Sequence, residues 1–190
     1  MKKPKTLLRD IFGFDKFRPG QREIIDAVSS KKNVLAIMPT GGGKSLCFQL
    51  PALMSEGLTV VISPLIALMR DQVRGLQAAG VAAGALTSAN TEHQTDAVFS
   101  EIYAGKLKIL YVAPERLASS AMQSALFRFN VTSLVVDEAH CVSQWGHDFR
   151  PDYLRIGELR KSLGVPLAAF TATADKETRK EITERLFDGV

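Results

Sequence analysis

The chain has 190 residues, 46% of them hydrophobic and 23% charged, a composition that excludes an intrinsically disordered or low-complexity protein. It has no run of eighteen apolar residues and no apolar segment behind its basic start, so we expect neither a membrane span nor a signal peptide. The formal net charge is +4, with the positive charge concentrated in residues 1–45. Such a bias attracts polyanions but also occurs in proteins without such partners.

The cysteine content points to a reducing compartment. Cys47 and Cys141 lie far apart in the chain and match neither a zinc-ligand spacing nor a disulfide framework. We therefore expect a cytoplasmic protein, associated with the nucleoid if the source is bacterial, with no membrane partner.

Short apolar runs alternate with helical patterns along the chain. The runs predict β-strands at Val34–Met38, Thr59–Ser63, Ala82–Leu86, Lys108–Ala113, Ser133–Asp137 and Pro166–Thr171. Their almost continuous apolar character indicates a sheet covered on both faces. Helices are predicted at residues 64–79, from a capping box at Thr91 and Gln94 toward Gly105, and near residues 151–163 and 175–187. The helix at 64–79 would place one apolar stripe against the sheet, formed by Leu65, Leu68, Met69, Val73 and Leu76.

This alternation predicts one compact α/β domain, a parallel β-sheet with helices on both faces. We divide it into a helical segment at residues 1–32 and a lobe that contains the sheet at residues 33–190. Ligands of such sheets bind beyond the carboxyl ends of the strands, so the loops after the strands are where chemistry is expected.

A glycine-rich loop follows the first predicted strand and precedes a helical stretch, Leu46 to Met54. Its glycines allow backbone N–H groups to face phosphate oxygens, and the helix N-terminus favours the same anion. Lys44 is predicted to contact the β- and γ-phosphates of ATP, and Ser45 to ligate Mg²⁺. The alternative is an ordinary turn before a helix, which the strand-loop-helix context disfavours. The predicted phosphate-binding residues are Thr40, Gly41, Gly42, Gly43, Lys44 and Ser45.

Two acids end the fifth predicted strand, in the tetrapeptide Asp137-Glu138-Ala139-His140. We assign Asp137 to Mg²⁺, through a water, and Glu138 to polarising the nucleophilic water, because phosphoryl transfer depends on positioning and charge compensation. A solvated acidic strand end is the alternative.

These motifs resemble motifs I (GGGKS) and II (DEAH) of superfamily 2 helicases. Met38 stands where the general phosphate-loop pattern has glycine, and these helicases commonly lack that glycine. Two stretches narrow the resemblance to RecQ helicases: residues 14–21 are similar to motif 0, and residues 141–153 to the aromatic-rich loop. Motifs Ia, Ib and III are matched by Ser63–Gln72, Ala113–Leu117 and Thr171–Ala174.

The resemblance implies a RecA-like P-loop NTPase fold and ATP-dependent 3′-to-5′ unwinding of DNA in repair and recombination. It also implies a second RecA-like lobe with an arginine finger, and single-stranded and partly duplex DNA as partners. The lobe in this chain would bind nucleotide without unwinding DNA. A nucleotide-dependent binding module is the alternative, and a small-molecule kinase is disfavoured by Met38 and the loop at residues 141–153.

Motif 0 is expected to recognise adenine. Gln21 can make a bidentate contact to adenine N6 and N7, and Pro19 would fix it in the first turn of a helix. Phe14 or Phe17 could stack on the base and Arg18 could add a cation-π contact, although either phenylalanine could instead belong to the core.

The aromatic-rich loop offers rings and an arginine directly after the acids, as a single-strand stacking site requires. A loop buried under the sheet edge is the alternative. His140 is interpreted as a hydrogen-bond partner between motifs, with a surface histidine as the alternative, and Arg70 and Gln72 as contacts to the DNA backbone or solvated helix residues. The residues predicted for DNA binding or coupling are His140, Ser143, Gln144, Trp145, His147, Phe149, Arg150, Thr171 and Thr173.

Overall fold

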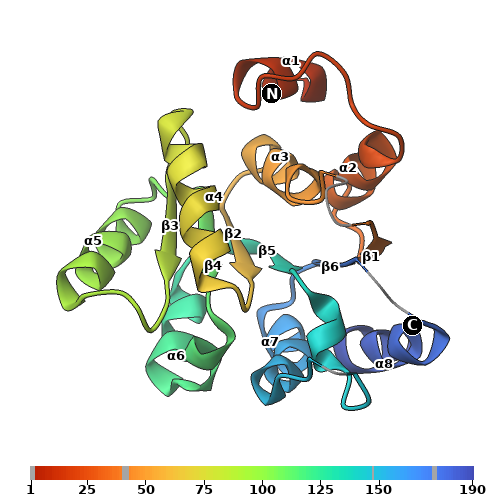
Figure 1. Cartoon of the computed structure of the whole chain (residues 1–190). Helices are drawn as coiled ribbons and strands as arrows, with labels where there is room; N and C mark the ends of the chain where they lie inside the picture. The colour runs from red at the N-terminus through yellow and green to blue at the C-terminus, as the bar shows by residue number, and fades with distance from the viewer. Residues whose placement is uncertain (1–2, 40–42, 147, 173–174) are drawn as a thin grey trace.

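A six-stranded parallel sheet in the order β1-β6-β5-β2-β4-β3 forms the centre of the chain (Figure 1). This computed structural model describes residues 3–39, 43–146, 148–172 and 175–190. The strands lie within two residues of their predicted bounds, which confirms the predicted fold class. They are β1 Val34–Ile37, β2 Leu58–Ile62, β3 Ala83–Leu86, β4 Ile109–Val112, β5 Val131–Val136 and β6 Leu167–Thr171.

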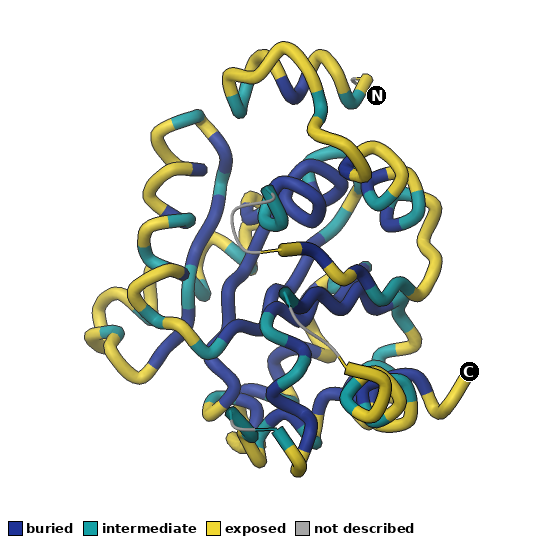
Figure 2. The backbone as a smooth tube through the Cα atoms, turned by 45° about the vertical axis from the view of Figure 1, so that its right-hand side comes forward, coloured by how far each residue is buried: buried dark blue, intermediate teal, exposed yellow. Residues whose placement is uncertain are grey.

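Helices cover both faces of this sheet, and each face has its own apolar core (Figure 2). Alternate strand residues point to opposite cores, so Val61 and Val135 belong to one cluster while Val60 and Leu134 belong to the other. The first cluster is completed by α1 Pro4–Asp10, α2 Gln21–Ser29, α3 Leu46–Met54 and α4 Ile66–Ala78. The second is completed by α5 Glu92–Tyr103, α6 Ser120–Arg128, α7 Ile156–Leu163 and α8 Lys176–Phe187.

Three short 3₁₀ helices connect these elements: η1 Pro114–Ala118, η2 Ala139–Val142 and η3 Pro151–Arg155. The single helix predicted near residues 151–163 is therefore two elements, η3 and α7. The predicted capping box is present, since Thr91 accepts a hydrogen bond from the Gln94 N–H and the Gln94 side chain accepts one from the Thr91 N–H. In the described part of the chain, no helix is long and apolar enough to cross a membrane.

Two predictions about apolar positions were wrong. On α4, Met69, Val73 and Leu76 are buried, but Leu65 and Leu68 are 44% and 40% exposed. Leu65 precedes the helix with extended backbone, and Leu68 lies about 100° around the helix from the centre of the buried stripe. Helices cover both faces of the sheet, but at the edge strand β1 the side chain of Ile37 is 45% exposed.

The helix α2 begins two residues later than a proline at its first position would place it. Gly20 is the N-cap, with a φ of +84° that favours glycine, and Pro19 lies before it. Pro19 is therefore outside the first turn, while Gln21 is the first helical residue. This places the side chain of Gln21 at the helix terminus nearest the glycine-rich loop.

The two glycines inside α7 and α4 should respond oppositely to alanine. A Cβ on Gly157 would collide with the carbonyl oxygen of Arg185, so α7 and α8 would have to separate. We expect Gly157→Ala to destabilise the fold by about 1–3 kcal/mol, as overpacked cores do. Gly75 has no atom within 4 Å of that position. Gly75→Ala should therefore stabilise the fold by about 0.5–1 kcal/mol. Urea unfolding of both variants checks the pair, and an equal effect of the two substitutions would contradict this packing.

Candidate active site

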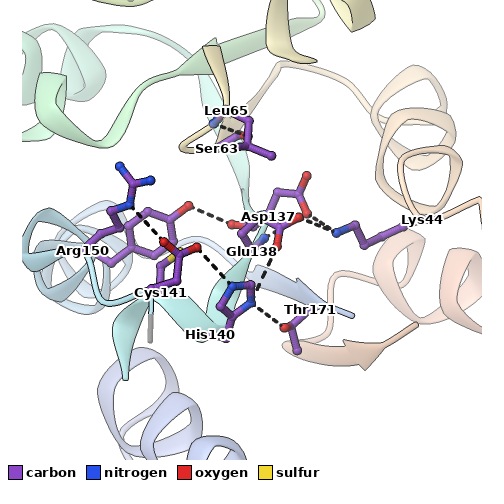
Figure 3. A network of polar contacts seen from close by, with 11 residues as sticks. Lys44, Ser63, Leu65, Asp137, Glu138, His140, Cys141, Arg150 and Thr171 are labelled. Atoms are coloured by element: carbon purple, nitrogen blue, oxygen red, sulfur yellow. Dashed lines mark hydrogen bonds and ion pairs between the residues drawn. The ribbon is translucent and has the colours of Figure 1, made fainter. Parts of the chain in front are cut away.

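The predicted phosphate-loop lysine and the two acids meet at the carboxyl edge of the sheet (Figure 3). The strand order β1-β6-β5 places the loop after β1 close to the end of β5. The ammonium of Lys44 lies 2.9 Å from the Asp137 Oδ1 and 3.0 Å from the Glu138 Oε1. Residues from segments 94 positions apart therefore form one charge cluster.

Burial sets the electrostatics of this cluster. Asp137 is only 3% exposed, and burial raises its pKa above the ordinary value although the charge of Lys44 partly offsets that effect. Burial also disfavours the charged form of Lys44, but attraction to Asp137 and hydrogen bonds to both acids outweigh it, so the pKa of Lys44 is raised. The lysine is thus held as a cation and opposes the two carboxylates.

The backbone turns sharply at Glu138 to bring both acids toward Lys44. Glu138 has φ 54° and ψ 47°, a left-handed conformation that is uncommon for a residue with a side chain. Its N–H donates to the Asp137 Oδ1 at 2.9 Å, and the helix η2 begins immediately afterwards. Such strain costs about 1–3 kcal/mol and is typical of functional sites.

Gln21 connects the motif 0 segment to the glycine-rich loop. Its Oε1 accepts the Arg18 N–H at 2.7 Å, and its Nε2 donates to the Gly43 carbonyl at 3.1 Å. Gly43 has a φ of +77°, and a Cβ there would overlap the Gln21 amide. One lone pair and one N–H of that amide remain for a ligand. Thr40, Gly41 and Gly42 lie outside the described residues.

A pocket of about 210 Å³ opens beside Gln21. Phe14 and Arg18 line it, and Phe14 is 53% exposed. Phe17 does not line this pocket; it packs on the core beneath α2, and the guanidinium of Arg22 lies 5.8 Å from its ring centre. Of the two phenylalanines predicted for base stacking, Phe14 is therefore the one placed at the pocket, while Phe17 is half-buried and packs against the core. Sequence reasoning missed four lining residues: Phe12, Lys16, Leu46 and Gln49.

His140 connects the acids to motif III, as predicted. Its Nδ1 lies 2.9 Å from the Thr171 hydroxyl and 3.6 Å from the Glu138 Oε2. Thr171 ends β6, the strand between β1 and β5. The surface alternative for His140 is wrong, because its side chain is only 18% exposed. Thr173 lies outside the described residues.

A backbone hydrogen bond joins the start of the aromatic-rich loop to a residue near its end. The Arg150 N–H donates to the Cys141 carbonyl at 2.8 Å, which closes the loop. Trp145 is 86% exposed at its tip, so burial under the sheet edge is wrong for this residue. Phe149 is half-buried and Arg150 lies 3.7 Å from Asp148. His147 lies outside the described residues.

Other residues of this stretch have protein partners. Ser143 and the N–H of Gln144 donate to the Glu181 carboxylate at 3.3 and 2.8 Å, which fixes the loop to α8. Tyr153 is fully buried, and its hydroxyl donates to the Asp137 carbonyl at 2.8 Å. Tyr153 therefore supports the carboxyl end of β5 and does not belong to an exposed stacking surface.

A buried relay that sequence reasoning missed joins α3, β4 and α4. The Gln49 Nε2 donates to the Tyr111 hydroxyl at 2.8 Å, and that hydroxyl donates to the Gln72 Oε1 at 2.7 Å. Gln49 was detectable as the one polar residue in an otherwise apolar helix. Gln72, expected to be a DNA contact or a solvated residue, faces inward, and Arg70 donates to the Ala89 carbonyl at 3.0 Å.

Comparison with known proteins settles the family. A sequence profile described as DEAD/DEAH box helicase matches residues 18–182. The chain belongs to the DEAD/DEAH box helicase family. Within this helicase family, it is 46% identical over 189 residues to the ATP-dependent DNA helicase RecQ of Haemophilus influenzae. It is 48% identical over 181 residues to RecQ of Pasteurella multocida. The matches cover 98% and 95% of this chain but only 30% and 29% of those relatives.

Solved helicase structures share the fold. The chain superposes with a TM-score of 0.75 on a hypothetical ATP-dependent RNA helicase from Sulfolobus tokodaii, at 20% identity, over 100% of this chain and 56% of that one. The helicase MrfA bound to DNA and AMPPNP gives a TM-score of 0.75 at 19% identity, over 100% of this chain and 28% of that one. At these identities the likeness concerns the fold alone.

The relay through Tyr111 should contribute measurably to stability. Tyr111→Phe removes a hydroxyl that serves both glutamines in a site that is 1% exposed, so we expect a loss of about 1–3 kcal/mol. Tyr103→Phe is the matched control, because Tyr103 is 63% exposed and should change stability by less than about 0.5 kcal/mol. Thermal and urea unfolding measure both. Equal, small effects would show that the relay contributes nothing.

Proposed function

We propose that the chain is the ATP-binding lobe of a DNA helicase that couples ATP hydrolysis to 3′-to-5′ movement on DNA and its unwinding in repair and recombination. The observation that carries this proposal is the Lys44 ammonium between two strand-end acids beside a glycine-rich loop. Relatives named ATP-dependent DNA helicases support it. The proposed partners are single-stranded and partly duplex DNA and a second RecA-like lobe. Without that lobe, we expect nucleotide binding but no unwinding.

The residues at this edge fit a magnesium nucleotide. Mg²⁺ prefers oxygen ligands, and Asp137 and Ser45 offer a carboxylate and a hydroxyl near Lys44. Lys44 already opposes two carboxylates, so a phosphate group would be recognised by the same ammonium. Asp137 and Ser45 would hold the Mg²⁺, which would supply positive charge to stabilise the negative charge that develops on the phosphates during transfer. Glu138, held by the left-handed turn, is proposed to orient the attacking water.

Loss of Lys44 should remove most nucleotide affinity. Charge-assisted contacts to phosphate contribute about 1.5–3 kcal/mol each, so Lys44→Ala should weaken binding of ATP or ADP with Mg²⁺ by about 10–150-fold. Lys106→Ala, at an exposed position after α5, is the control. Calorimetric titration measures both, with circular dichroism to establish that the variants fold. Unchanged affinity in folded Lys44→Ala would show that the phosphate assignment is wrong.

Adenine selectivity should depend on Gln21. The geometry of its amide, fixed by Arg18 and Gly43, leaves one donor and one acceptor for adenine N7 and N6. ATP should bind better than GTP, because guanine has the O6 acceptor where adenine has the N6 donor, while N7 is an acceptor in both bases. Gln21→Glu keeps the size of the side chain and removes the amide donor. This variant and, separately, Gln21→Ala should each reduce the preference for ATP over GTP. Competition titrations of ATP against GTP measure it. Equal affinities in the unaltered chain, or an unaltered preference in both variants, would assign Gln21 to structure alone.

We propose that the exposed Trp145 stacks on single-stranded DNA and that this contact changes the rate of ATP hydrolysis. The loop closes at Cys141, three residues after Glu138, so a ligand on the loop acts close to His140. A base-aromatic stack contributes about 1–3 kcal/mol, enough to bias a loop between two arrangements.

In the two-lobed parent, Trp145→Ala should therefore lose DNA-stimulated ATP hydrolysis while nucleotide affinity and melting temperature stay unchanged. Tyr103→Ala is the control, since it removes another exposed aromatic ring from α5. Phosphate release with and without single-stranded DNA measures the effect. A joint fall in melting temperature and nucleotide affinity would indicate a structural tryptophan, and full stimulation without Trp145 would rule out the coupling.

A further inference from the structure

The side chains of His140, Cys141 and Asp148 lie close together next to Asp137 and Glu138 in the chain, and each offers a different metal-binding atom. The His140 Nε2 is 3.5 Å from the Asp148 Oδ2, and the Cys141 thiol sulfur is 3.7 Å from the same oxygen. The nitrogen, sulfur and oxygen all lie within 4.8 Å of one another. The proposed nucleotide chemistry uses neither Cys141 nor Asp148, and sequence spacing gave no reason to group them.

Two of the three separations match those of ligands around one small cation. Zinc binds sulfur at about 2.3 Å and nitrogen or oxygen at about 2.0–2.2 Å, tetrahedrally. Those bond lengths imply about 3.4 Å between the nitrogen and the oxygen, and about 3.6 Å between the sulfur and the oxygen. The two measured distances differ from these by about 0.1 Å. We propose that His140, Cys141 and Asp148 form a binding site for a thiophilic divalent cation of the zinc class.

The surroundings of the cluster resemble the outer shell of a metal site. The other ring nitrogen of His140 lies 2.9 Å from the Thr171 hydroxyl, which would orient the imidazole with its Nε2 toward the cation. The second oxygen of Asp148 lies 3.7 Å from the Arg150 guanidinium. The Asp148 side chain is 41% exposed while Cys141 is buried. A cation can therefore enter from the Asp148 side, where a water can complete the four ligands.

The ligand atoms also make this site chemically different from the proposed magnesium site. A thiolate and an imidazole select zinc-like cations, whereas Mg²⁺ prefers oxygen ligands only. On binding, the sulfur-to-metal bond forms as the thiol proton leaves to solvent.

Cation binding would fix the aromatic-rich loop. Cys141 lies at the start of the loop and Asp148 lies two residues before Arg150, which closes it. Trp145 lies between them in the sequence. A metal bound to both would hold the loop in the closed arrangement against η2. The consequence for DNA stimulation rests on the proposed function, whereas the binding itself does not.

Cobalt titration of the purified, metal-free 190-residue chain tests the site directly. With a phosphine reductant and no nucleotide, DNA or Mg²⁺, Co²⁺ should bind one-to-one with thiolate charge-transfer absorption and tetrahedral visible bands. Zn²⁺ should displace it, and excess Mg²⁺ should not. Zn²⁺ should also change the fluorescence of Trp145, the single tryptophan of the chain.

Matched variants assign the ligands. Cys141→Ser should abolish the charge-transfer absorption, whereas Cys47→Ser, at the other buried cysteine, should keep it. Asp148→Asn keeps the thiol and should weaken Co²⁺ binding at least tenfold, which serves as the test if Cys141→Ser does not fold. Thr171→Val should weaken it about 10–100-fold through the outer shell.

Two results would overturn the site. One is the absence of thiolate absorption at millimolar Co²⁺, and the other is absorption that disappears in Cys47→Ser but persists in Cys141→Ser. Because the titration needs neither nucleotide nor DNA, its failure leaves the proposed ATP-binding role standing. Loss of that role would equally leave the metal titration unchanged.

Discussion

The contact between the Lys44 ammonium and the carboxylates of Asp137 and Glu138 is the interaction on which the site depends. A carboxylate as buried as that of Asp137 is unfavourable unless a cation faces it, and the phosphate loop supplies that cation. The strand order β1-β6-β5 makes the meeting possible, because it places the ends of three strands at one edge. In the proposed function, the same cluster would recognise a magnesium nucleotide, because phosphate would face Lys44 in place of the carboxylates and Mg²⁺ would face Asp137 in place of the ammonium.

The neighbouring contacts connect this cluster to the surfaces that would meet DNA. The Asp137 carbonyl accepts the Tyr153 hydroxyl, His140 reaches Thr171, and the loop that carries Trp145 closes on Cys141. A change at any of these points acts within one or two contacts of Asp137. The connection between these residues is therefore short and local.

Residue type and spacing were enough to predict the sheet and to place Lys44 and the two acids at one site, because the glycine-rich loop and the acidic pair both follow strands of one parallel sheet. The direct ion pairs of Lys44 with Asp137 and Glu138 were not predicted. The sequence could not separate Phe14 from Phe17, since both are phenylalanines near one helix and only packing decides which is buried. The inward direction of Gln72 likewise depends on Tyr111 in a distant strand. Local patterns also omit contacts such as that of Gln144 with Glu181, which forms only after α8 docks.

A double-mutant cycle on the nucleotide-free chain tests the central claim most directly. Urea unfolding would be measured for Lys44→Met, Asp137→Asn and the two together. Lys44→Met alone leaves a buried carboxylate without its cation, and breaking such a pair costs about 3–5 kcal/mol. The account predicts that the double variant loses less stability than the sum of the single variants, by at least about 1 kcal/mol. Additive losses would contradict it, because they would show that lysine and acid do not interact in the folded chain.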